Sequence, residues 1–114
     1  TFLEYAINSG LYDEEAVKSS IKNLVLMGIY EKPFHPEIRS EIRKLLFENF
    51  TVVTSFEMQK EIEDIITENE PRAKIEAVVV RELNDNYLGV TIRFRLAGVP
   101  SQSHSISLPL ERIR

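Results

Sequence analysis

Carboxylates are the residues with the most potential for chemistry in this sequence. Glu48 and Glu70 could be imagined as the paired acids of a glycosidase. Such a pair must lie about 5 to 9 Å apart, and the pKa of one member must be raised. No motif places these two glutamates together, so surface or ion-paired acids are the simpler interpretation. A small peptidoglycan-cleaving muramidase is therefore kept as the alternative function.

Other residue types that commonly do chemistry are few. His35 stands beside Pro36, where a helix cap is expected, and His104 begins a predicted strand, so both fit structural roles better than those of a ligand or base. The sequence holds no glycine-rich phosphate loop, no histidines at metal spacing and no nucleophile elbow. We therefore expect no catalytic residue, no metal and no cofactor.

The stretch "ITENEPRAKI" places Glu70, Pro71 and Arg72 between a helical and a strand-like segment. The proline stiffens the chain, so the two charged side chains are held on a corner, and arginine can grip a carboxylate through two nitrogens. Such a corner could dock on a partner protein. Alternatively, Arg72 pairs locally with Glu70 or Glu68 and simply finishes the helix, and both interpretations stay open.

Composition limits the partners and the compartment. With 114 residues, 43% of them hydrophobic, the chain is long enough for a single domain spanning 1–114. Its formal charge of -4 disfavours nucleic acid and favours a protein partner. No run approaches the roughly 20 apolar residues of a membrane span. The sequence has no cysteine, which fits a reducing cytoplasm and excludes a thiolate metal site.

The first half of the chain has helical periodicity. Residues 1–12 are apolar but interrupted at 8–10, so an extended docking arm and a folded helix are both open. A helix is predicted over 13–27, opened by Asp13 and closed by Gly28. A second helix begins at Pro36 and buries Ile38, Ile42, Leu45 and Leu46.

A third helix is predicted to end near Asn69, because Pro71 disfavours helical geometry at Glu70. Its start has the pattern of a capping box between Thr54 and Glu57. A hydrophobic staple between Val53 and Met58 would accompany that box.

After Pro71 the apolar period changes from 3.6 to 2. The strand over 73–83 is predicted to place Ile75, Ala77 and Val79 on one face and Val78 and Val80 partly on the other. Residues 84–86 are turn-forming, and the strand that follows alternates strictly from Leu88 to Leu96. A strand over 104–110 faces inward with Ile106, Leu108 and Leu110, and Pro109 marks it as an edge.

The fold class is therefore α+β: three N-terminal helices packed on a C-terminal three-stranded antiparallel β-meander. Within the single domain, 1–12 form an arm, 13–70 the helical part and 71–114 the sheet part.

Four stretches in order, "SIKNLVLMGI", "PFHPEIRSEIRKLLFENF", "ENEPRAKIEAVVV" and "YLGVTIRFRL", resemble the baseplate wedge and sheath-initiator family of contractile phage tails and type VI secretion baseplates. The likeness covers about residues 20–110. The chain differs from the family at Ile38 and Arg39, where an aromatic residue and a glycine are usual, and at Asn69, where an aromatic residue is usual.

The resemblance implies a non-enzymatic structural protein, although the family label has carried the word lysozyme. Glu70, Pro71 and Arg72 are the family's mark, and "LLFE" also matches its pattern. The resemblance therefore implies that Glu70, Pro71 and Arg72, with Phe47 and Glu48, contact the helical core bundle of neighbouring wedge subunits.

It also implies that the hairpin over 87–110 templates the tail sheath by strand addition, with six copies in each baseplate, in a virion tail assembled in the host bacterial cytoplasm. The strand residues expected to bind sheath are Arg93, Arg95, His104, Ser105, Ile106, Ser107, Leu108 and Leu110. Which edge of the hairpin takes the added strand stays open, as does a free-standing adaptor role unrelated to tails.

Overall fold

The computed structural model describes residues 2–30, 42–46, 48–97 and 99–112. Three helices come first: α1 (Phe2–Tyr30), α2 (Ile42–Leu46) and α3 (Val52–Asn69). Three strands follow: β1 (Ala73–Glu82), β2 (Tyr87–Leu96) and β3 (Val99–Glu111). The α+β class is confirmed, but the predicted three helices are confirmed only in part, since one is very long and one spans five residues.

The strands form one antiparallel sheet in the order β1-β2-β3, so β2 lies in the centre. The turn between β1 and β2 is closed by Asn84, whose side-chain oxygen accepts hydrogen bonds from the backbone of Asn86 at 2.7 Å and Tyr87 at 2.9 Å. Arg112 ties the end of β3 to this turn, because its backbone amide donates to Asn86 and its buried guanidinium to Glu82.

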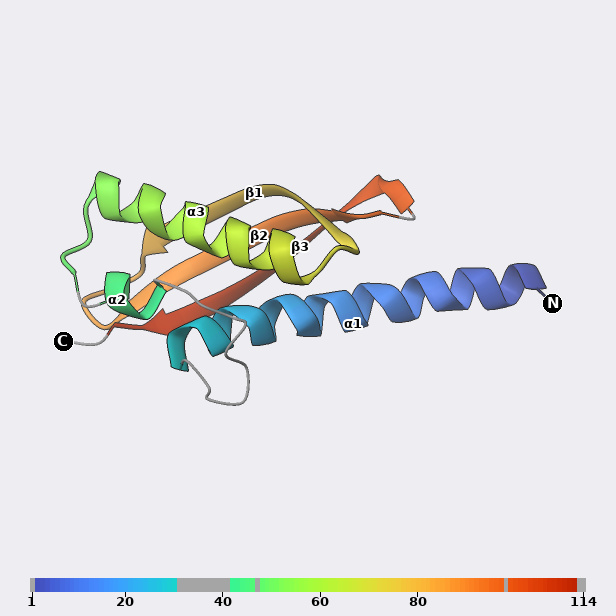
Figure 1. The fold of residues 1–114 in the computed structure, drawn as a ribbon, viewed down its shortest axis with the longest axis horizontal. Coiled ribbons are helices and arrows are strands. Elements are labelled where there is room, and N and C mark those ends of the chain that lie inside the picture. The colour runs from blue at the N-terminus through green and yellow to red at the C-terminus, as the bar shows by residue number, and fades with distance from the viewer. Residues whose placement is uncertain (1, 31–41, 47, 98, 113–114) are drawn as a thin grey trace.

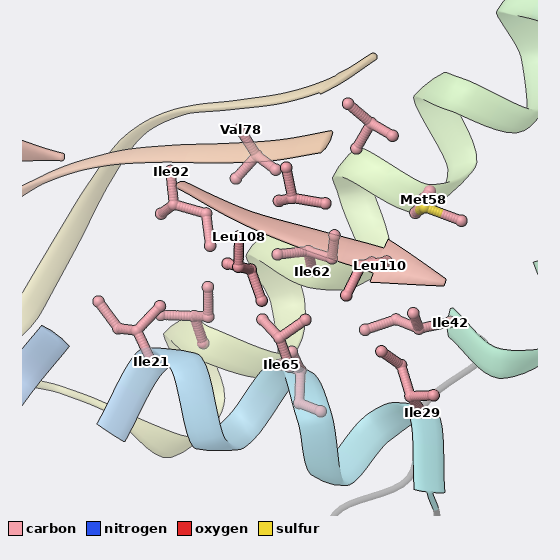
Figure 2. Close-up of a cluster of buried hydrophobic side chains, with 14 of the residues drawn as sticks. Ile21, Ile29, Ile42, Met58, Ile62, Ile65, Val78, Ile92, Leu108 and Leu110 are labelled. Atoms are coloured by element: carbon pink, nitrogen blue, oxygen red, sulfur yellow. The ribbon is translucent and has the colours of Figure 1, made fainter. Parts of the chain in front are cut away.

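Helices α1 and α3 cover one face of the sheet, with α3 along β1 and α1 nearer β3 (Figure 1). One hydrophobic cluster draws side chains from all six elements. Figure 2 shows its centre, where Ile21 of α1, Ile62 and Ile65 of α3 and Leu108 of β3 converge. On the other face of the sheet lies none of the described helices, and we call it the open face. No helix in the described ranges is both long and apolar enough to cross a bilayer.

Helix α1 differs from its prediction at both ends. It begins at Phe2 and continues through residues 8–10, so neither an extended arm nor a start at Asp13 is right. A glycine inside a helix costs only about 1 kcal/mol, which the surrounding helix tolerates. Gly28 lies buried inside the helix, which continues to Tyr30, and is not a C-terminal cap.

Helix α2 confirms the burial of Ile42, Leu45 and Leu46. The predicted start at Pro36, together with His35 and Ile38, lies outside the described residues.

The N-terminus of α3 is capped by Thr51 and not by Thr54. Thr51 has an extended backbone, and its hydroxyl oxygen accepts from the amide of Thr54 at 3.1 Å. Thr54 is itself buried and donates its hydroxyl to the carbonyl of Asn49, so it cannot form the predicted capping box. The predicted staple is also wrong, because Val53 is 65% exposed while Met58 is buried. The predicted end at Asn69 is confirmed.

The two predicted faces of strand β1 are not equally covered. Val78 and Val80 are buried, whereas Val79 is 42% exposed on the open face. The pairing with β2 is irregular between Ile75 and Ala77, and this shifts the alternation that the sequence pattern follows. The alternation of β2 is confirmed throughout, and β3 is longer than predicted because pairing begins at Val99.

Candidate functional site

The corner after α3 is built around a buried carboxylate. Glu70 caps the helix, donates its backbone amide to Ile66 at 2.7 Å and is only 4% exposed. Its two carboxylate oxygens accept from Nε and Nη2 of Arg72 at 2.8 and 3.0 Å. The carbonyl of Arg72 accepts from Ala97 at 2.9 Å, which fixes the corner against the end of β2.

The hydrogen bonds from Arg72 lower the pKa of Glu70 from its ordinary value of 4.5 to about 2, against the opposing effect of burial. A hydrogen bond from Ser20 adds to this lowering and links the corner to α1. The local-pair interpretation is therefore realised in the fold. The side chain of Arg72 is nevertheless 48% exposed, so a partner can still reach it.

Glu48 lies at the other end of α3 from this corner. It precedes the 18-residue helix, which is about 27 Å long, while Glu70 follows it. A helix of that length between them argues against a glycosidase pair, whose carboxylates lie about 5 to 9 Å apart. Glu48 is exposed, and Phe47 lies outside the described residues. The expected wedge contacts are therefore divided between the two ends of α3.

A groove of about 310 Å³ adjoins Glu48 between α2 and α3. It is lined by Lys44, Leu45, Glu48, Glu57, Lys60, Glu61 and Asp64. No group of three or more potential metal ligands occurs in the described part of the chain. The groove is a charged surface feature.

The expected sheath-binding residues fall on two faces of the sheet. Arg93 and Arg95 lie on the open face and surround Glu76, at 4.0 and 3.1 Å. Ser103 donates to the same carboxylate at 2.6 Å, and this bond is the largest cause of the lowered pKa of Glu76, ahead of the arginines. Ser105 and Ser107 share this face, whereas His104, Ile106, Leu108 and Leu110 point toward the helices.

His104 joins β3 to α1. Its Nδ1 lies 3.2 Å from a carboxylate oxygen of Glu14, which also pairs with Lys18 at 3.0 Å. The hydrogen bond from Lys18 is the largest cause of the lowered pKa of Glu14. The imidazole is 9% exposed and packs near Phe94, with ring centres 5.6 Å apart. These contacts fit a structural histidine better than a catalytic base.

The two outer strands differ in how their free edges are covered. On β1, the backbone of Val80 donates to the side chain of Gln59 at 3.2 Å and accepts from the hydroxyl of Ser55 at 3.4 Å. Helix α3 therefore closes this edge at Val80. The sequence signal for this contact is that two polar residues, Ser55 and Gln59, stand four apart and so share one side of α3.

Beside β3 the surface opens into a groove of about 260 Å³. Residues 106–108 of β3 form one wall, and Lys18, Ser19 and Lys22 of α1 form the other. No sequence signal connected these lysines with the strand, because the helix and the strand are far apart in the chain.

Comparison with known proteins supports the fold described above. No protein-family model matches the chain. The chain is 32% identical over 96 residues to the baseplate wedge protein gp25 of Enterobacteria phage T4, covering 83% of this chain and 73% of that protein. A crystal structure of a Geobacter sulfurreducens protein provisionally named tail lysozyme superposes with a TM-score of 0.78 over 90% of this chain and 93% of that one. At 19% identity, this second likeness shows the fold alone. The identity and coverage of the first show that the chain belongs to the baseplate wedge protein family.

Proposed function

We propose that this chain is a non-enzymatic structural component of a contractile tail baseplate. It docks on neighbouring wedge subunits through Glu70, Pro71 and Arg72, and it begins the sheath by accepting a strand at the free edge of β3. The observation that carries the proposal is the difference between the two sheet edges, since α3 closes β1 at Val80 while β3 borders a groove.

The sheet leaves one place for an added strand in the hairpin. Strand β2 is paired on both sides and cannot accept another. Strand β3 is an outer strand, and unpaired edge groups can bond an extended segment of another protein. This supports strand addition on the β3 side of the hairpin, and the groove beside residues 106–108 provides room for the incoming chain.

Pro109 indicates which amides point outward. A proline has no amide to donate, so its position in an edge strand is one whose nitrogen faces away from the sheet. Ser107 lies two residues earlier and shares this orientation, because backbone direction repeats every second residue in a strand. The hydroxyls of Thr91 and Ser107, 3.1 Å apart, fit the close approach of side chains in such a pair.

The corner supports docking because little freedom is lost when it binds. The bidentate bond to Glu70 holds the half-exposed guanidinium in one orientation. Arginines of this kind contribute strongly to protein interfaces, often about 2 kcal/mol or more.

The geometry does not favour a muramidase. Glu48 and Glu70 stand at opposite ends of α3, and the pKa of Glu70 is lowered, whereas a catalytic acid needs a raised pKa.

The experiment that tests the sheath role is Ser107→Pro in a tail-assembly system. This change removes one outward amide from the edge while leaving the bonds between β2 and β3 in place. We expect baseplates that contain the variant protein but carry no sheath, as seen by electron microscopy. Ser107→Ala is the matched control and should carry normal sheath. Normal sheath on Ser107→Pro baseplates would contradict the proposal.

The docking role needs a variant that does not leave Glu70 buried and unpaired. Arg72→Ala alone leaves the Glu70 carboxylate buried without its partner, which destabilises the domain. The double variant Glu70→Gln with Arg72→Ala removes both charges, and we expect a folded protein that fails to enter baseplates. Glu70→Gln alone is the control. Incorporation of the double variant at the wild-type level would refute docking through Arg72.

A further inference from the structure

The first turn of α3 carries an apolar patch exposed to solvent. Val52, Val53 and Phe56 are 71%, 65% and 63% exposed. They lie within five residues, so they share one end of the helix, and we call them the α3 patch. Exposed apolar side chains that stand together commonly mark a surface on which another protein packs.

The α3 patch continues into the groove between α2 and α3. Val53 is one turn before Glu57, and Glu57 begins the row of α3 residues that line the groove. Four carboxylates line it against two lysines, and Lys60 is already 3.7 Å from Asp64. Glu48 and Glu57 have no ion-pair partner among the described residues. The groove is therefore negatively charged beside an apolar end.

We infer that the α3 patch and this groove together bind a basic amphipathic helix of another protein in the assembly. Its apolar side chains would cover Phe56 and the two valines, and lysines or arginines on its flanks would face Glu48 and Glu57. Such apolar centres with a charged rim are usual in protein interfaces. The inference uses neither the edge of β3 nor Arg72, although it shares Glu48 with the expected wedge contacts.

A helix fits this surface better than an extended strand. The groove lies between two helices, and neither offers the extended row of outward amides and carbonyls that strand addition requires. A second copy of this chain is a poor occupant. The outer part of α1, residues 2–13, is apolar enough but contains Glu4 and Asp13 and no lysine or arginine. Charge complementarity therefore selects a basic partner.

The first test uses two synthetic helical peptides with the same leucine stripe, one flanked by lysines and one by glutamates. Titration into the purified chain, followed by calorimetry, should show binding of the lysine peptide only, weakening as salt is raised. Phe56→Ser and Glu57→Lys should each weaken binding about tenfold or more. Leu83→Ser and Glu68→Lys are the controls, because they change an exposed leucine and an exposed glutamate outside this surface. Equal binding of both peptides, or unchanged binding by Phe56→Ser, would overturn the inference.

The second test uses the assembled baseplate. A photo-crosslinking residue at position 53 should join to a lysine- or arginine-rich segment of amphipathic pattern, identified by mass spectrometry. The same residue at position 83 serves as the control and should not join to that segment. A crosslink from position 53 to an acidic or strand-forming segment, or no crosslink, would refute the basic-helix partner. This conclusion would hold whether or not the Ser107 and Arg72 variants assemble as proposed.

Discussion

The buried carboxylate of Glu70 determines what Arg72 can do. A carboxylate that is 4% exposed is tolerated in a folded protein only when it is paired and hydrogen-bonded. Arg72 supplies that pairing through two nitrogens and keeps about half of its side chain in solvent. One residue therefore supports both the fold and the proposed interface, and substitutions there must separate the two effects.

Acid should weaken the fold through Glu70. Its pKa is about 2 in the folded chain and near 4.5 when unfolded, so the unfolded state binds the proton more readily. The stabilisation is fully present above about pH 5 and is lost as the pH falls from 4.5 towards 2. We expect the loss to be about 2 kcal/mol after allowance for the solvent around Arg72. Urea unfolding from pH 7 to pH 2.5 measures it.

Glu70→Gln should flatten this pH dependence, because glutamine does not titrate. Glu68→Gln, which changes an exposed glutamate of the same helix, is the control and should keep the wild-type slope. Parallel curves for wild type and Glu70→Gln would show that another group causes the acid sensitivity.

Among the elements, α3 does the most to position the candidate sites. Its C-terminus sets the corner, its N-terminus carries the α3 patch, and its side chains at Ser55 and Gln59 close the edge of β1. Because one helix links three surfaces, the bonds that fix its ends affect all of them.

Thr51→Ala should destabilise the domain by about 1 kcal/mol, since it removes the oxygen that accepts from the amide of Thr54. Glu57→Ala should change the free energy of unfolding by less than about 0.5 kcal/mol, as expected for an exposed residue that takes no part in the cap. Chemical denaturation of both variants measures these values. A larger destabilisation by Glu57→Ala than by Thr51→Ala would instead support a capping box between Thr54 and Glu57.

At the scale of the whole molecule, α1 is longer than the body on which it packs. Its 29 residues span about 43 Å, and Figure 1 shows its N-terminal part extending beyond the sheet and the other helices. The buried residues of α1 in the described core are Val17, Ile21, Leu24, Val25 and Ile29, all in its C-terminal half. The C-terminal half of α1 therefore holds the helix to the described core.

Removing residues 1–10 should leave the free energy of unfolding within about 1 kcal/mol of the full chain, because this end of α1 belongs to the part that extends beyond the sheet and the other helices (Figure 1). Val17→Ala, at a fully buried position, should cost about 2 kcal/mol. Denaturant titrations compare the two. A loss above 2 kcal/mol on truncation would mean that the outer part of α1 also packs on the body.

The sequence by itself determined the features that depend on neighbouring residues in the chain. Pro71 ended α3 at Asn69, Asn84 closed the turn, and strict alternation placed the buried residues of β2. Proline geometry, an Asx turn and the two-residue period of a strand are local properties, so a linear pattern reveals them. The order of helices before strands followed from the same periods.

Only the tertiary structure decided the features that depend on distant residues. The pairing of β1 with β2 chose which face of β1 is buried. The length of α3 put Glu48 and Glu70 at opposite ends, Ser55 and Gln59 closed one sheet edge, and α1 formed a groove beside the other. Burial and edge accessibility arise when segments far apart in the chain come together, and no local pattern of residues contains that information.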